Sequence, residues 1–182
     1  MAMREVAPVE ASELPLAELT AHLRLGTGFA DDGLEAPAVE RACRAALTAV
    51  EARTGRSLIA RPFVWRMWHR PRSGVAVAPF APILSVTSVE VVRGGERTTV
   101  GGWHASDDAL GDLPLVPAGG SVEVSLSAGM GAWSDLPADL CEAVLLVGAA
   151  LYEARGGAAP EVPDAVRGLI APWRRLRIGG VR

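Results

Sequence analysis

The sequence contains no lysine, asparagine or glutamine, so all eighteen of its basic side chains are arginines. The absence of lysine excludes Schiff-base chemistry and a Walker-type phosphate loop, because both depend on a lysine amine. The two cysteines, Cys43 and Cys141, are too few for a metal site of their own, and each lies in an apolar stretch with helical spacing. We therefore expect buried, reduced thiols and no bound metal.

Long hydrophobic runs are also lacking. The longest, Ala143 to Leu151, falls far short of the roughly 20 residues that cross a bilayer. Residues 1–16 alternate acidic and apolar side chains, so we expect no signal peptide. The net charge of −3 is too small to hold nucleic acid or a membrane through bulk charge. With 49% hydrophobic and 21% charged residues, the sequence predicts a soluble intracellular protein without a membrane partner.

Patterns of catalytic residues are scarce as well. The three histidines do not form a His-x-x-x-His motif, and no Cys-x-x-Cys or Gly-x-Ser-x-Gly motif is present. Residues 104–108 contain the residue types of a hydrolase triad, but neighbours in one loop rarely converge on one reacting atom. Asp31 and Asp32 are better explained as a helix cap than as a cation site. The sequence therefore predicts a protein that is not an enzyme.

Helical periodicity appears at three places before the C-terminal region. Residues 16–25 predict a short amphipathic helix, and residues 37–53 predict a longer one that Gly55 ends. A third helix is expected from Pro137 to about Arg155, with Ser134 or Asp135 as its cap.

The third helix is apolar over an unusually wide arc. Such a helix is buried on more than one side, either by the rest of the chain or by another copy of it. We predict that it lies partly at a subunit interface formed by Leu145, Val147 and Tyr152. This helix has two adjacent apolar stripes. One consists of Leu140, Val144, Val147 and Leu151, and the other of Cys141, Leu145, Gly148 and Tyr152.

The middle of the chain changes to the pattern of β-strands. Gly94-Gly95 is a two-residue hairpin turn between two such segments, and the prolines of residues 79–82 exclude that stretch from a central strand. We predict an α+β fold in which helices, including one long buried helix, pack on a small antiparallel sheet or curled sandwich. The expected strands are residues 57–68, 75–78, 85–93, 97–103 and 121–127.

The C-terminal region differs in composition from the rest. Residues 162–170 predict one more short helix, broken at Pro172, and arginines surround Trp173 in the segment that follows. This basic tail, which lacks a core of its own, could fold on a partner protein or contact a nucleic-acid backbone. A third interpretation is a solvated, frayed terminus.

Six segments, spread over most of residues 16–176, carry a resemblance to a known family. They are Leu19-Thr20-Ala21-His22-Leu23-Arg24-Leu25 with Asp31-Asp32, residues 50–58, residues 79–89, Ser127-Ala128-Gly129-Met130-Gly131, Leu136-Pro137-Ala138-Asp139-Leu140 and Tyr152-Glu153-Ala154-Arg155. In their order they resemble the phage head–tail connector, or adaptor, proteins, within the branch found in phages and phage-derived gene transfer agents.

The resemblance implies a structural subunit with no catalysis and no cofactor. It implies a homo-oligomeric ring, commonly a dodecamer, that lies between the portal protein and a stopper or tail terminator protein and extends the channel for double-stranded DNA. The protein would be located at the head–tail junction of a phage-like particle, and in the host cytoplasm during assembly.

The resemblance also divides the chain into a core domain (1–155), a linker (156–162) and a portal-docking segment (163–182). We expect that segment to be ordered only on the portal, so that Trp173→Ala should weaken docking without changing the stability of the core. The alternative is a small DNA-binding module that uses the basic tail. The predicted docking residues are Arg167, Trp173, Arg174, Arg175, Leu176, Arg177 and Ile178.

Overall fold

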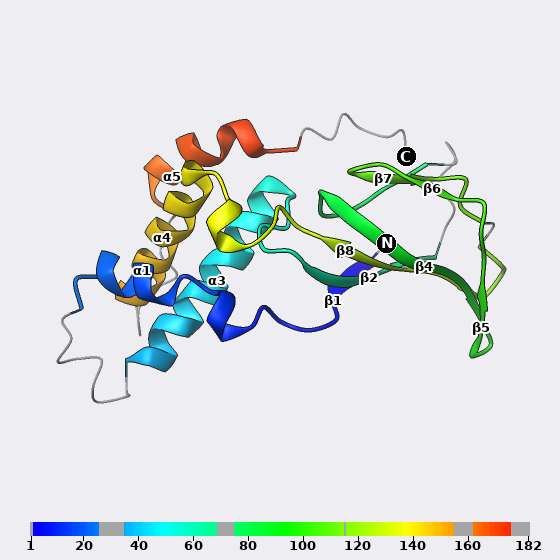
Figure 1. The fold of residues 1–182 in the computed structure, drawn as a ribbon, viewed down its shortest axis with the longest axis horizontal. Helices are drawn as coiled ribbons and strands as arrows, with labels where there is room; N and C mark the ends of the chain where they lie inside the picture. Colours follow the sequence, from blue (N-terminus) through cyan, green and yellow to red (C-terminus); the bar gives the residue numbers. More distant parts are fainter. Residues whose placement is uncertain (1, 26–34, 69–74, 115, 155–161, 176–182) are drawn as a thin grey trace. The chain divides into compact units, whose positions relative to one another are not determined.

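The computed structural model describes residues 2–25, 35–68, 75–114, 116–154 and 162–175. The chain forms two compact units, one made of residues 1–8 and 59–130 and the other of residues 9–58 and 131–182. The first unit contains the β-strands and the second contains the α-helices (Figure 1). The predicted α+β class with antiparallel sheets is confirmed.

The β-unit is built on a five-stranded antiparallel sheet with the order β1-β2-β8-β4-β5. Its central strand, β8, is the segment whose sequence alternates most regularly, and it pairs with β2 on one side and β4 on the other. The strands are β1 (Ala2–Glu5), β2 (Arg61–Met67), β4 (Ile83–Arg93), β5 (Glu96–Thr99) and β8 (Ser121–Ala128).

A smaller three-stranded sheet, with the order β3-β7-β6, shares one hydrophobic core with the large sheet. Ala76 and Leu110 of the small sheet lie in the same buried cluster as Trp65, Val89 and Val124 of the large sheet. The β-unit is therefore a small sandwich. The strands of the small sheet are β3 (Ala76–Val77), β6 (His104–Ala105) and β7 (Ala109–Gly111).

The predicted turn and the predicted break in the β-region are both present. Arg93 pairs with Glu96 across Gly94 and Gly95, whose φ angles of 59° and 91° suit glycine. Residues 79–82 lie outside the strands, and β4 begins directly after them.

The helical unit is organised around the antiparallel pair of α3 and α4 (Figure 1). Gly148 of α4 lies beside Ala46 of α3 and Leu19 of α1, where a Cβ atom at position 148 would come within 3.1 Å of the leucine. The helices are α1 (Leu16–His22), α3 (Ala36–Thr54), α4 (Ala138–Glu153) and α5 (Asp164–Ile170), and the 3-10 turns are η1 (Ala11–Glu13), η2 (Trp133–Asp135) and η3 (Ala171–Trp173).

The helix ends agree with the sequence at some points and differ at others. Gly55 ends α3 in the left-handed conformation, as predicted. The predicted cap of α4 is wrong, because Pro137 precedes this helix and the carboxylate of Asp135 instead accepts the backbone N–H of Ala132 in η2 (2.9 Å). The predicted cap of α3, Asp31-Asp32, lies outside the described residues. In the described part of the chain, no helix is long and apolar enough to cross a membrane.

Candidate functional site

The loop that contains the residue types of a hydrolase triad does not bring them together. His104 Nδ1 lies 3.2 Å from Asp112 Oδ2, and both side chains are exposed to solvent. Ser106 donates its hydroxyl to the carbonyl of Ala109 at 3.3 Å, as expected of a polar turn. Among the described residues, no group of three or more His, Cys, Asp or Glu side chains could hold a metal ion.

The C-terminal segment is packed against the helical unit rather than separate from it. Val166 and Ile170 of α5 are buried, and α5 lies against α4. This differs from the expectation of a tail without a core of its own, because two apolar side chains one helical turn apart are enough to seat a short helix on a larger one. Most of the predicted linker lies outside the described residues.

Trp173, which follows α5, links the start of α4 with the end of α3. Its indole N–H donates to Asp139 Oδ2 at 2.6 Å, and its carbonyl accepts the Nε–H of Arg56 at 2.9 Å. The guanidinium carbon of Arg56 also lies 5.8 Å from the centre of the indole ring, within the range of a cation–π contact. Two residues later, the backbone N–H of Arg175 donates to the carbonyl of Thr54 at 3.0 Å.

The predicted docking residues therefore differ in their accessibility. Arg167 and Arg174 are exposed, whereas Trp173 and Arg175 are half-buried. Leu176, Arg177 and Ile178 lie outside the described residues. Of the predicted docking residues that the structure describes, Arg167 and Arg174 are the ones whose side chains a partner could reach directly.

The predicted subunit-interface residues also separate into two classes. Val147 and Tyr152 are buried in the core of the helical unit, and the hydroxyl of Tyr152 donates to the carboxylate of Glu35 at the start of α3. Leu145 is half-buried on the outer side of α4. A side chain already buried by its own chain cannot also be buried by a neighbour, so the interface prediction now depends on Leu145.

A buried carboxylate on the large sheet was missed by the sequence analysis. Glu123 of β8 is 4% exposed and forms ion pairs with Arg66 of β2 and with Arg97, whose Nη1 lies 2.9 Å from it. Arg97 also contacts Glu90 at 2.8 Å, and these hydrogen bonds, that of Glu90 first, raise the pKa of Arg97. A glutamate between Val122 and Val124 was the available signal, but its partners come from other strands.

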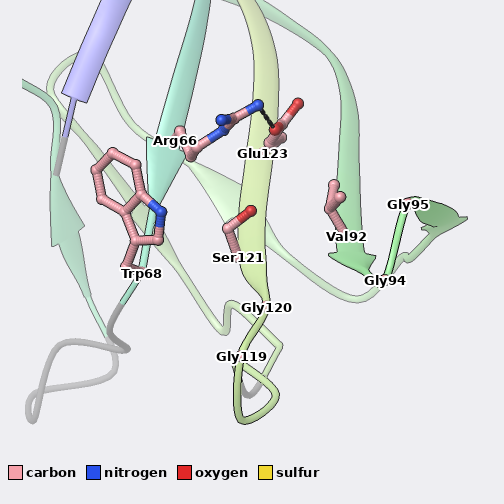
Figure 2. A pocket seen from close by; sticks show the side chains of 9 residues that line it. All are labelled: Arg66, Trp68, Val92, Gly94, Gly95, Gly119, Gly120, Ser121 and Glu123. Carbon is pink, nitrogen blue, oxygen red and sulfur yellow. Dashed lines mark ion pairs between the residues drawn. The ribbon is translucent and has the colours of Figure 1, made fainter.

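A shallow pocket of about 540 Å³ lies beside this network. Figure 2 shows Arg66 reaching toward Glu123, with the indole of Trp68 next to them and the glycine turns of two loops below. The lining includes the hydroxyl of Ser121, but its one carboxylate, Glu123, is engaged by Arg66 and Arg97 and is not free to act as a base. Its chemistry does not indicate catalysis.

Comparison with known proteins gives a consistent result along the whole chain. A solved chain from the neck of an empty gene transfer agent particle, computed with C6 symmetry, is 40% identical, with 100% of both chains covered and a TM-score of 0.88. A chain from the virion of a native gene transfer agent particle is 39% identical, with 100% of this chain and 99% of that chain covered and a TM-score of 0.85. A third, from the neck of a native particle computed with C12 symmetry, is 34% identical, with 100% of both chains covered and a TM-score of 0.79. No protein-family model and no curated protein matches the sequence.

Proposed function

This chain belongs to the family of neck proteins of gene transfer agent particles, and from that premise we propose that it is the adaptor subunit of the head–tail junction. It is a structural component of such a particle's neck. As the adaptor, it forms a ring of twelve copies between the portal and a stopper or tail terminator protein, and the ring extends the channel through which double-stranded DNA passes. Similarity over the full length of the chain is the observation that carries this proposal.

A ring is supported by the C6 and C12 symmetry with which the related necks were computed. A structural role rather than an enzymatic one fits residues 104–112, where His104 and Asp112 are exposed and Ser106 donates to a backbone carbonyl rather than to the histidine. The alternative, a small DNA-binding module with a basic tail, needs a free tail. The packing of α5 and the bonds of Trp173 and Arg175 instead commit the segment up to residue 175 to the helical unit.

Within this proposal, the C-terminal segment docks on the portal. Buried Val166 and Ile170 hold α5 in place while Arg167, whose Nε lies 3.7 Å from Asp164 Oδ1, and Arg174 remain exposed, which gives portal carboxylates two accessible cations to contact. Trp173 has its indole N–H engaged by Asp139, so we assign it the role of positioning the segment. Residues 176–178 extend the docking segment beyond the described part of the chain.

The test is recovery of the portal by the immobilised protein, together with the native mass of the complex. Wild-type protein should form a ring on the portal. Because both arginines contact the partner, the Arg167→Glu/Arg174→Glu variant should recover roughly tenfold less portal. The matched control is Arg4→Glu/Arg93→Glu, which reverses two exposed arginines of the β-unit. Equal recovery by all three proteins would remove the segment from docking, and no ring with or without the portal would contradict the adaptor assignment.

A further inference from the structure

The outer side of α4 carries two leucines between two carboxylates. Leu145 and Leu146 are only half-buried, and Glu142 and Glu153 are exposed. At about 100° per residue, these positions lie on the side of the helix opposite the buried residues of the core. We define the α4 outer face as Glu142, Leu145, Leu146, Ala149 and Glu153.

The outer side of α3 has the opposite character in both size and charge. It consists of small exposed side chains, with an arginine at its N-terminal end. Among the described residues, Arg41 pairs with no carboxylate. We define the α3 outer face as Arg41, Ala45, Thr48 and Ala52, which recur every three or four residues and so lie on one side of the helix.

We propose that the α4 outer face of one copy packs on the α3 outer face of the next copy around the ring. Small side chains let a second helix approach closely, so the two leucines can fit over the alanines and the threonine. The carboxylate of Glu153 on one face complements the guanidinium of Arg41 on the other. A cyclic ring also requires two different surfaces on each protomer that fit one another, and the helical unit carries both. This inference rests on the proposed adaptor function.

The direction of the helices decides which charges meet. Within one copy α3 and α4 are antiparallel, because Tyr152 near the end of α4 bonds Glu35 at the start of α3. Neighbours in a ring of twelve differ by only one-twelfth of a turn, so α3 of the next copy runs in nearly the same direction as α3 of the first. It is therefore also nearly antiparallel to α4 of the first copy. Arg41, near the start of α3, therefore meets Glu153, at the end of α4.

The spans of the two faces agree with this pairing. At a rise of about 1.5 Å per residue, Arg41 and Ala52 lie about 17 Å apart along α3, and Glu142 and Glu153 also lie about 17 Å apart along α4. With Arg41 opposite Glu153, the leucines of α4 therefore lie over the small side chains of α3.

The experiment uses two charge reversals, Arg41→Glu and Glu153→Arg, in the full chain with the portal. Each variant should remain folded, since both positions are exposed, and each should lower the ring fraction in native mass spectrometry by roughly tenfold, because the repulsion recurs at every interface. Mixing the two variants in equal amounts should restore the ring. In a ring that alternates the two variants, the reversed α3 outer face of one variant meets the reversed α4 outer face of the other. The next interface joins two unchanged faces, so opposite charges meet at every interface. Glu96→Arg, on the β-unit, is the matched control and should assemble like wild type.

The outcomes separate this inference from the adaptor assignment. Wild-type ring fractions in both single variants would overturn the pairing of the faces while leaving the ring intact. Loss of the ring in both variants without recovery in the mixture would also overturn it. Failure of the wild-type protein to form a ring would instead contradict the proposed function on which the inference rests.

Discussion

Two of the bonds that hold the C-terminal segment are charge-assisted, and both are made by Trp173. Its ring N–H donates to Asp139 of α4 and its carbonyl accepts from Arg56, which follows α3, so one residue connects these two parts of the helical unit. A hydrogen bond to a charged group is worth more than one between neutral groups, and leaving one partner unsatisfied adds a desolvation cost. The sequence identified Trp173 as important but could not reveal its partners, which lie 34 and 117 positions away.

Trp173→Phe should therefore destabilise the protein by about 1–2 kcal/mol, because it removes the indole donor and keeps most of the ring. This replaces the sequence-based expectation that a change at Trp173 would leave stability unaltered. The measurement is the free energy of unfolding in urea. Trp68→Phe is the matched control: its side chain is 45% exposed, so the same substitution should cost little. Equal stability of the two variants would argue against the Asp139 bond.

Glu123→Ala should destabilise the protein by about 2–4 kcal/mol, since it removes a buried carboxylate and leaves two arginines without it. Arg66 and Arg97 are themselves well exposed, which moderates the penalty. The control is Glu96→Ala, an exposed glutamate whose loss should change the free energy of unfolding by less than about 0.5 kcal/mol. A cost at position 123 no larger than that of the control would mean that the ion pairs contribute nothing.

At the scale of the elements, long periodic segments were predictable and short ones were not. α3 and α4 lie within a residue or two of their predicted bounds, because several turns of helical spacing identify a buried face. β6 and β7 have two and three residues, too few to show any period. β1 was missed because its pairing with β2 depends on residues about 60 positions away.

The turn between β4 and β5 gives a prediction at this scale. Gly95 has a φ of 91°, a conformation that residues with a Cβ atom disfavour. Gly95→Ala should therefore lower the free energy of unfolding by about 1 kcal/mol and the melting temperature by a few degrees. Gly101→Ala is the matched control, because its φ is not in that region and nothing lies within 4 Å of an added Cβ atom. Similar melting temperatures for the two variants would contradict the strained turn.

At the scale of the whole molecule, the sequence indicated the class and the family but not the division of the chain. The two units are each assembled from two separate stretches, with crossings near residues 8, 58 and 130. Such crossings leave no mark in composition, whereas the glycine- and alanine-rich stretch at 156–160 does, and this favoured a boundary there. Contacts between distant stretches, rather than local sequence, decide which segments share a core.

The whole-molecule charge leads to the last prediction, that the protein does not bind double-stranded DNA tightly. Every phosphate that a conduit neutralises adds salt-sensitive affinity and slows passage. Glu90 and Glu123 are offset by arginines, but Asp107, Asp108 and Asp112 are exposed, and the net charge is −3. In fluorescence anisotropy at physiological salt, we expect a Kd weaker than about 100 µM for the full chain and for a chain ending at Arg175. A Kd near 1 µM would favour the DNA-binding alternative, provided that added salt weakens the binding steeply and that removal of residues 176–182 abolishes it.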